Sequence, residues 1–344
     1  MSSAAAPPAP SPTDPGRPSD PGEFFKLAYK RLSESIGAIG VGLLLVLLLE
    51  IVFFSLQSEF FLDWANFKNI GRAMTIIGIA AIGQTVVIIA GGFDLSVGSV
   101  MAAAGILSAF LINHGTPFAL AIAAALGLGL IIGFFNGSIV AYLRINPLIA
   151  TLATLSIVRG LAFVITSGQA EVISNETYLS VGTGSVFGIP TVVVLLIVLF
   201  LAVGFILPRT RFGRYAYAIG SNTRASRLSG IRVPRWQLCF YGLSGLLAAV
   251  AGCVTVARTG TAEPSANITA ELEVITAVIL GGASLAGGRG RLFGTFLGLA
   301  VLAILANGLI LMGVASYWQQ VVKGAVLLIA VVWDELRRTR RDVD

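Results

Sequence analysis

Hydroxyl and amide side chains interrupt the apolar runs of this 344-residue chain at a few positions. Such groups both donate and accept hydrogen bonds, so a row of them could pass a polar solute along without holding it tightly. They could equally join neighbouring helices, which is a common role for polar residues inside membranes. Thr151 and Thr154 are three residues apart and therefore share one face of a helix. The candidates for a translocation path or gate are Asp94, Ser96, Asn136, Asn146, Thr151, Thr154 and Asn307.

Asp94 needs a separate account, because a carboxylate in the middle of a bilayer is costly. The glycines around it, Gly91 and Gly98 among them, favour a break between two helices, and irregular backbone is tolerated where it faces protein or water. Asp94 could then act as a hinge or gate near the cytoplasmic end of a path. It could also cap the next helix by accepting hydrogen bonds from the amides of Ser96 and Val97. Both roles stay open.

Other kinds of chemistry find little support in the sequence. His114 is the only histidine, so metal sites and histidine-based catalysis are not predicted. Cys239 and Cys253 fall on one predicted helix about 21 Å apart, too far for a disulfide. The forty glycines contain no G-x-x-x-x-G-K-[ST] phosphate loop. If ATP drives this protein, another chain must hydrolyse it.

Composition places the chain among all-α integral membrane proteins, because 56% of its residues are apolar and only 12% are charged. The mean hydropathy is +0.89. A membrane span takes about 20 apolar residues, so the chain has room for about ten helices and for no sizeable soluble domain. The predicted spans are 37–57, 70–90, 97–113, 118–142, 147–167, 190–208, 236–257, 271–287, 293–313 and 317–334.

The chain divides into three regions. Residues 1–35 read as a disordered to amphipathic N-terminal tail, since Ala, Pro and Ser dominate its start and no signal-peptide pattern is present. The transmembrane domain covers 36–335, and 336–344 form a short C-terminal tail. An even number of spans puts both termini on one side. That side receives 18 of the 23 Lys and Arg residues, so the positive-inside rule makes both tails cytoplasmic in a multi-pass membrane protein.

Glycine recurs at a spacing of four residues on two predicted helices. Gly129, Gly133 and Gly137 lie on one face of the first, and Gly294 and Gly298 repeat the spacing on the second. Small residues at this spacing allow two helix backbones to approach closely. We therefore predict helix packing, and no ligand binding, at these glycines.

A basic island, Thr210–Gly230, interrupts the apolar pattern within the longer polar loop 209–235. Ser, Asn and Thr are good helix N-caps, and three of them stand in a row at 221–223. The residues that follow can form a short helix, Arg224–Leu228, before Gly230 stops it. A short helix in a cytoplasmic loop could dock on a partner and carry its motion into the membrane. The alternative is a loop whose arginines serve only to set the topology.

Three sequence blocks resemble the ribose-type sugar permeases of ATP-binding-cassette importers. They are AIGQTVVIIAGGFDLSVGSVMAAAG at 81–105, NGSIVAYLRINPLIATLATLSIVRG at 136–160, and ARTGTAEPSANITAELEVITAVILGGASLAGGRGRLFGTFLG at 257–298. The third block lies within a longer similar segment, 210–334. With the spans between them, the blocks cover essentially everything after residue 40.

The resemblance implies a BtuC-like importer permease fold in a bacterial cytoplasmic (inner) membrane. It implies a path for a pentose, hexose or related polyol delivered by a periplasmic or extracytoplasmic binding protein. The implied partners are a second permease copy or a paralogue, and two ATPase subunits that bind ATP–Mg, so this chain itself binds no cofactor and is no enzyme. A permease of the same superfamily for branched-chain amino acids or nucleosides is the alternative, followed by an ion-coupled secondary transporter.

The resemblance also places the family's ATPase-coupling helix in the basic island. The letters ASRLSG at 225–230 match the family pattern A-[AS]-R-L-S-G. The residues expected to couple the permease to its ATPase are Ser221, Asn222, Thr223, Arg224, Ala225, Ser226, Arg227, Leu228, Ser229 and Gly230.

Overall fold

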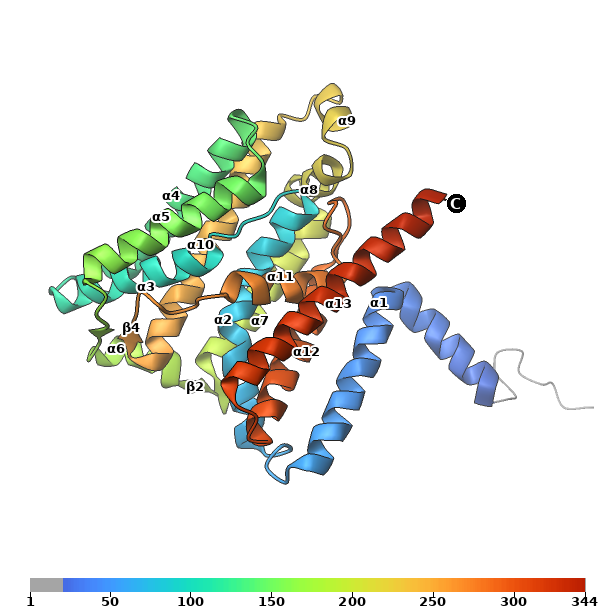
Figure 1. The fold of residues 1–344 in the computed structure, drawn as a ribbon, viewed down its shortest axis with the longest axis horizontal. Helices are drawn as coiled ribbons and strands as arrows, with labels where there is room; N and C mark the ends of the chain where they lie inside the picture. Colours follow the sequence, from blue (N-terminus) through green and yellow to red (C-terminus); the bar gives the residue numbers. More distant parts are fainter. Residues whose placement is uncertain (1–20, 344) are drawn as a thin grey trace, which may run out of the picture.

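A computed structural model describes residues 21–343, and this part of the chain is almost entirely helical. Figure 1 shows the helices gathered into one bundle, with α1 and α13 at one side. Two very short antiparallel strand pairs complete the secondary structure: β1 (Glu171–Val172) pairs with β4 (Thr261–Ala262), and β2 (Ser185–Val186) pairs with β3 (Ile189–Pro190). The predicted all-α class is confirmed.

The helices follow the apolar runs of the sequence. Their bounds are α1 Pro21–Gln57, α2 Trp64–Ile89, α3 Val97–Asn113, α4 Phe118–Tyr142, α5 Pro147–Thr166, α6 Glu176–Thr183, α7 Thr191–Arg209, α8 Arg211–Ser221, α9 Thr223–Leu228, α10 Val233–Thr259, α11 Ala270–Leu280, α12 Leu292–Leu311 and α13 Ser316–Val343. The part of the N-terminal tail before residue 21 lies outside the described residues. The segment at 21–35 is helical and runs into the first span, and α13 continues beyond residue 335.

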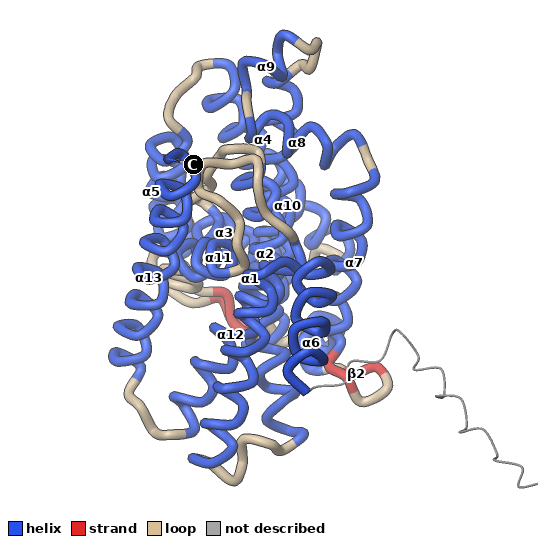
Figure 2. Tube along the Cα trace, turned by 90° about the vertical axis from the view of Figure 1, so that its right-hand side faces the viewer, coloured by secondary structure: helices blue, strands red, loops and turns tan. Residues whose placement is uncertain are grey.

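Two helices form the centre of the bundle. In the apolar windows of α2 and α10, 72% and 78% of the residues are buried, compared with 22–28% in α4, α5 and α7. The outer helices turn Leu, Ile and Phe side chains outward, as lipid-facing helices do. Figures 1 and 2 show α2 and α10 enclosed by the other helices. Most polar side chains in the buried parts of α2 and α10 therefore have to find partners inside the protein.

Within residues 21–343, seven helices are long and apolar enough to cross a membrane: α1, α2, α4, α5, α7, α10 and α12. The shorter α3 is also apolar. The predicted span 271–287 is wrong in its second half, because α11 ends at Leu280. Glycines in the left-handed region follow it, with φ of +89° at Gly282 and +84° at Gly287. Glycine adopts such angles freely and so ends the helix there.

The predicted glycine packing on α4 is confirmed. A methyl group at Gly129 would overlap the carbonyl oxygen of Gly245, and one at Gly133 would overlap the carbonyl oxygen of Tyr241, both on α10. The glycines of α12 pack in the same way against the backbone of α11. Small residues therefore set how close these helix pairs come.

The α4–α10 crossing predicts a stability difference between two glycine variants of one helix. Gly133→Ala should lower the stability by about 1–3 kcal/mol, because its methyl group has to push α10 away. Gly127→Ala is the matched control, since nothing lies within 4 Å of a methyl group there. The measurement is the thermal unfolding midpoint of each detergent-solubilised variant. Equal midpoints for the two variants would show that the crossing tolerates a wider separation.

Candidate functional site

The loop between α2 and α3, residues 90–96, is held by a buried carboxylate. We call this segment the Asp94 loop. Asp94 is 1% exposed. Its Oδ1 accepts hydrogen bonds from the amide (3.0 Å) and the hydroxyl (2.6 Å) of Ser96, and its Oδ2 accepts one from the hydroxyl of Ser244 on α10 (2.8 Å). Both carboxylate oxygens are thus occupied, and the side chain joins the loop to the central helix α10.

Two more helices bond to the Asp94 loop. The Nδ2 group of Asn136 on α4 donates to the hydroxyl oxygen of Ser96 (2.8 Å). The amide of Leu95 donates to the hydroxyl oxygen of Thr151 on α5 (3.0 Å). Four of the predicted path or gate residues, counting Asp94 and Ser96, therefore meet at one place. They come from the loop, α4 and α5.

Tyr241 and Ser244 complete this network, and the sequence reasoning did not select them. The hydroxyl of Tyr241 donates to the carbonyl of Phe93 (3.0 Å) and accepts from the amide of Phe93 (3.2 Å). Tyr241 and Ser244 stand three residues apart on α10, so they share a helix face. Two polar residues three positions apart in an otherwise apolar helix are the sequence pattern that could have identified them.

The helix-cap interpretation of Asp94 is only partly correct. Its side chain does accept from the amide of Ser96. However, Ser96 itself occupies the N-cap position of α3, which begins at Val97. Asp94 lies two residues before this N-cap, and its second oxygen accepts from Ser244 on α10. It therefore links the loop to α10 as much as it caps α3.

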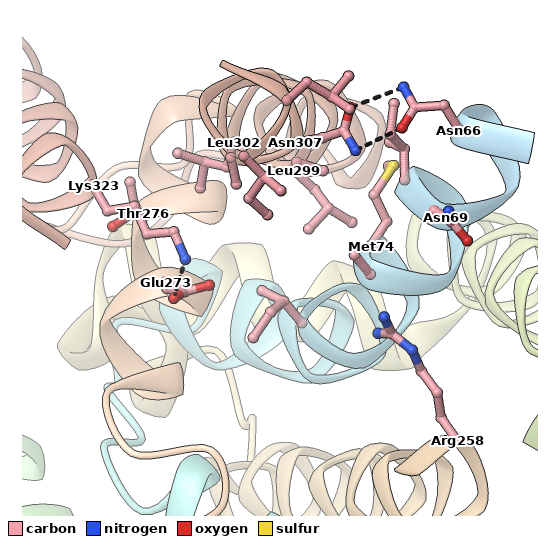
Figure 3. A pocket seen from close by; sticks show the side chains of 17 residues that line it. Asn66, Asn69, Met74, Arg258, Glu273, Thr276, Leu299, Leu302, Asn307 and Lys323 are labelled. Carbon is pink, nitrogen blue, oxygen red and sulfur yellow. Dashed lines mark hydrogen bonds and ion pairs between the residues drawn. The ribbon is translucent and has the colours of Figure 1, made fainter. Parts of the chain in front are cut away.

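The other three predicted path residues lie elsewhere. Asn146 caps α5 by accepting from the amide of Leu148 (2.9 Å), and Thr154 donates to the carbonyl of Ala150 in its own helix (3.1 Å). Asn307 on α12 pairs with an asparagine of α2, as Figure 3 shows. The structure thus separates a network around Asp94 from a second polar region around Asn307.

Glycines connect the Asp94 loop to the basic island. We call Gly91, Gly220, Gly287 and Gly288 the glycine junction. The amide of Gly288 donates to the carbonyl of Ile89, the last residue of α2 (2.8 Å). A methyl group at Gly220, on α8, would overlap that same carbonyl, and one at Gly287 would come within 2.8 Å of the Cα atom of Gly91. Three chain segments therefore meet backbone to backbone.

A tyrosine reinforces this junction from α8. The hydroxyl of Tyr217 donates to the carbonyl of Gly290 (2.8 Å). Burial raises the pKa of the Tyr217 phenol above its usual range, so the group keeps its proton and its role as a donor. The loop 281–291 is thus attached to α8 by a side chain as well as by close packing.

The short helix predicted in the basic island is present as α9. The side chain of Asn222 accepts a hydrogen bond from the amide of Ala225 (2.9 Å), which makes it the N-cap. Of the three possible caps, Ser221 ends α8 and Thr223 begins α9. Gly230 stops the segment with a φ of +82°. Figures 1 and 2 show α9 projecting from one end of the bundle.

The exposed face of α9 combines positive charge with one apolar side chain. Arg224 and Arg227 are exposed, and Leu228 is 83% exposed. Ser226 is buried and faces the protein. The exposed surface of α9 therefore presents two arginines and, directly after the second, a leucine.

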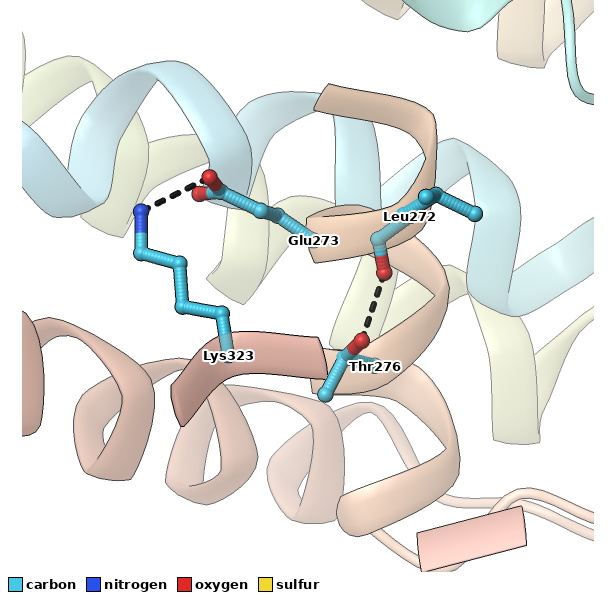
Figure 4. Close-up of polar contacts among 4 residues, drawn as sticks. All are labelled: Leu272, Glu273, Thr276 and Lys323. Carbon is cyan, nitrogen blue, oxygen red and sulfur yellow. Dashed lines mark hydrogen bonds and ion pairs between the residues drawn. The ribbon is translucent and has the colours of Figure 1, made fainter. Parts of the chain in front are cut away.

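The embedded charges have distinct environments. Lys323 on α13 forms an ion pair with Glu273 on α11 (2.7 Å), as Figure 4 shows. Arg159 donates to the carbonyls of Pro264 and Ala266, both at 2.7 Å. Glu50 has one buried oxygen with no partner among the described residues. No group of three His, Cys, Asp or Glu side chains that could hold a metal occurs in the described part of the chain.

Comparisons with known proteins agree with the resemblance seen in the sequence blocks. A family model described as branched-chain amino acid transport system / permease component matches residues 66–331. The chain is 42% identical over 299 residues to the ribose import permease protein RbsC of Escherichia coli K12, covering 86% of this chain and 93% of the relative. It is 40% identical over 296 residues to RbsC of Bacillus subtilis 168, with 86% and 92% covered. It is 37% identical over 278 residues to the L-arabinose transport system permease protein AraH of Escherichia coli K12, with 81% and 85% covered. No solved structure matches the chain.

The Asp94 network predicts that the hydroxyl of Ser244 stabilises the fold. Ser244→Ala leaves Oδ2 of Asp94 buried without its donor and should cost about 1–3 kcal/mol. The control is Ser138→Ala on α4, whose hydroxyl donates to the carbonyl of Phe134 in its own helix. Thermal unfolding in detergent measures both variants. A Ser244 variant as stable as the Ser138 variant would contradict the role given to this bond.

Proposed function

The chain belongs to the family described as branched-chain amino acid transport system / permease component, and on that basis we propose that it is the membrane-spanning permease subunit of an ATP-binding-cassette importer for a sugar. One observation carries the proposal: the chain is 42% identical to a ribose import permease over 93% of that protein's length. A relative that is known as an arabinose permease supports the same substrate class. A pentose is therefore the first candidate.

A branched-chain amino acid is the second candidate, because the family description names that substrate. The curated relatives favour the sugar, since ribose and arabinose permeases match the chain over more than four-fifths of its length. The substrate is expected to reach the permease on an extracytoplasmic binding protein. That protein selects the solute before this chain meets it.

We propose ten membrane segments arranged in a BtuC-like fold. Seven are the long helices, and the other three are α3, α11 and α13. With 11 residues, α11 is about 16 Å long and would enter about half of a hydrocarbon core of about 30 Å. All ten predicted segments are helical for most of their length, which supports the proposed count.

We propose that both termini and α9 are cytoplasmic in this multi-pass inner-membrane protein. The arginines of α8 and α9 are concentrated at one end of the bundle, and the loop with Arg289 and Arg291 packs against α8. Positive charge marks the cytoplasmic side of membrane proteins. The end of the bundle that bears α9 is then the side where ATP is available.

Permeases of this kind work with a binding protein and an ATPase, and we propose that α9 is where the ATPase docks. The permease would pair with a second copy or a paralogue, and two ATPase subunits would carry the ATP–Mg, with no cofactor on this chain. The exposed Arg224, Arg227 and Leu228 would form the contact. A displacement of α9 and α8 would also move the two glycine-rich loops, because Gly220 of α8 is in close backbone contact with both. Tightly packed segments move together.

The docking proposal predicts different effects for two exposed apolar residues. Leu228→Asp should strongly reduce co-purification of the partner ATPase, because a negative charge replaces the exposed apolar side chain that follows Arg227. Phe187→Asp is the control, since Phe187 is also fully exposed but lies in the turn between β2 and β3. Affinity purification from membranes, with the permease content of each membrane quantified, measures both. Equal recovery of the ATPase with the two variants would rule out α9 as the dock.

The substrate proposal predicts an uptake defect. Disruption of the gene should abolish uptake of radiolabelled ribose or arabinose, and the wild-type gene on a plasmid should restore it. Leucine uptake, measured in the same cells, should not change. A defect confined to leucine would favour the amino acid alternative, and a defect in neither would refute both.

A further inference from the structure

A groove lies between α1 and α13, and the end of α11 forms its floor (Figure 1). Its volume is about 390 Å³, which falls within the usual range for small-molecule sites. Leu43 and Val46 of α1 line one wall, and Ile329 and Ala330 of α13 line the other. Leu280 of α11 packs with apolar residues of both helices. Most of the groove therefore requires an apolar occupant.

The groove is open to the outside of the bundle. Val46 and Ile329 are exposed on its two walls, and the neighbouring Leu45 and Leu328 are exposed as well. A methyl group added at Gly42, on the α1 wall, would meet no atom within 4 Å. Apolar side chains on the outside of a membrane protein face the hydrocarbon of the bilayer. An acyl chain can therefore enter this groove directly from the membrane.

The loop 281–291 lies at one end of the groove, at the level of the membrane surface. Ser284 and Arg289 of this loop are lining residues. The amide of Gly288 donates to the carbonyl of Ile89, the last residue of α2 (2.8 Å). With 26 residues, α2 is about 39 Å long and exceeds a hydrocarbon core of about 30 Å. This end of the groove therefore lies where lipid headgroups lie.

The same end of the groove carries two opposite charges that do not pair with each other. Arg289 is exposed, and its guanidinium has no hydrogen-bond or ion-pair partner within the described part of the chain. Asp334 of α13 accepts from the amide of Leu285 through Oδ2 (3.1 Å), which leaves Oδ1 for another donor. The amide of Ser284 donates to the carbonyl of Arg289 (3.0 Å) and holds the two residues side by side. A cation, an anion and a hydroxyl are thus available together.

The loop 281–291 is joined to both walls of the groove. On the side of α1, a methyl group added at Gly282 would come within 2.7 Å of the Cδ1 atom of Ile39. On the side of α13, the hydrogen bond between Asp334 and Leu285 attaches the loop to the helix. A molecule in the groove therefore contacts α1, α13 and the loop that contributes to the glycine junction.

We propose that this groove binds a phospholipid with a phosphoethanolamine headgroup. The phosphate binds Arg289 and accepts a hydrogen bond from the hydroxyl of Ser284, and the ammonium group donates to Oδ1 of Asp334. One acyl chain lies along the apolar walls. An anionic phospholipid such as phosphatidylglycerol suits the arginine but lacks the ammonium group that complements Asp334. The bound lipid bridges α1 and α13 and supports the loop between them.

Tryptophan fluorescence reports on the groove, because Trp333 is one of its lining residues. The chain has four tryptophans, so Trp64→Phe, Trp236→Phe and Trp318→Phe leave Trp333 as the reporter. This full-length variant, in detergent micelles, is titrated with phosphatidylethanolamine brominated near the glycerol end of its acyl chains, since bromine quenches a nearby indole. Quenching should saturate. Its half-maximum should lie at an about tenfold lower lipid fraction than with brominated phosphatidylglycerol, as expected for one charged hydrogen bond.

Two substitutions in the same background test the charges. Arg289→Gln should raise the half-quenching fraction of phosphatidylethanolamine about tenfold. Arg235→Gln is the control and should leave it unchanged, because Arg235 is exposed on the first turn of α10 and is not a lining residue. Asp334→Asn keeps an acceptor for the amide of Leu285 and should remove the preference for phosphatidylethanolamine over phosphatidylglycerol.

A bulky side chain at Gly42 tests the groove itself. Gly42→Phe places a ring in the groove and should abolish the saturable quenching. Gly127→Phe on α4 is the matched control, because an added Cβ atom meets nothing within 4 Å at either glycine. As a second readout, phosphatidylethanolamine should raise the melting temperature of the wild type and of the Gly127 variant, and it should leave that of the Gly42 variant unchanged.

Several outcomes would overturn the lipid site. Quenching that rises with lipid without saturating would show an adventitious lipid only. A half-quenching fraction for phosphatidylglycerol that equals or undercuts that of phosphatidylethanolamine would refute the headgroup assignment. An Arg289 variant that matches the Arg235 variant, or a Gly42 variant that matches the Gly127 variant, would refute the position of the lipid. These measurements involve no sugar and no ATPase, so their failure and that of the proposed function are distinguishable.

Discussion

The absence of water in the bilayer core is the constraint on which the rest of this structure depends. Every polar group placed there needs a partner within the protein, and the break between α2 and α3 at 90–96 places a carboxylate inside the helix bundle. Asp94, the Ser96 hydroxyl and the Leu95 amide of this loop are matched by groups from α4, α5 and α10. The loop can therefore stay irregular without exposing its backbone to lipid.

Glycine packing makes these bonds possible. Because α4 and α10 cross at Gly129, Gly133 and Gly245, their backbones are close enough for short side chains to reach the same loop. Asn136, Tyr241 and Ser244 all act within that space. At the end of α2, glycines again let α8 rest on the backbone of both loops. The segments that pack against α8, next to α9, are thus the segments that hold the helix breaks.

The two polar regions differ in their chemistry, although the first also keeps one buried atom, Oδ1 of Asn136, without a partner among the described residues. Around Asp94, both carboxylate oxygens have donors, which favours one fixed arrangement of the loop. In the region of Asn307, the ion pair of Glu273 and Lys323 is partly exposed, with each side chain 31% exposed. Both regions lie on or against α2, which joins them through the membrane.

Features that depend only on neighbouring residues could be predicted from the sequence. Apolar runs located the helices, and the N-cap of α9 and its stop at Gly230 followed from local chemistry. The glycine spacing on α4 identified a packing face, although it could not name α10 as the partner. The end of α11 at Leu280 was not predicted. Counting apolar residues does not show that the glycines after Leu280 adopt positive φ angles, which end the helix.

Only the tertiary structure decided which distant groups meet. Asp94 and Ser244 are 150 positions apart, and Asn66 and Asn307 are 241 apart. Spacing along a helix shows which residues share a face, but it does not show which other helix that face meets. For this reason Asp94, Ser96, Asn136 and Thr151 proved to be neighbours while Asn307 did not. The same limit hid Tyr241 and Ser244, whose importance depends on partners that packing brings near.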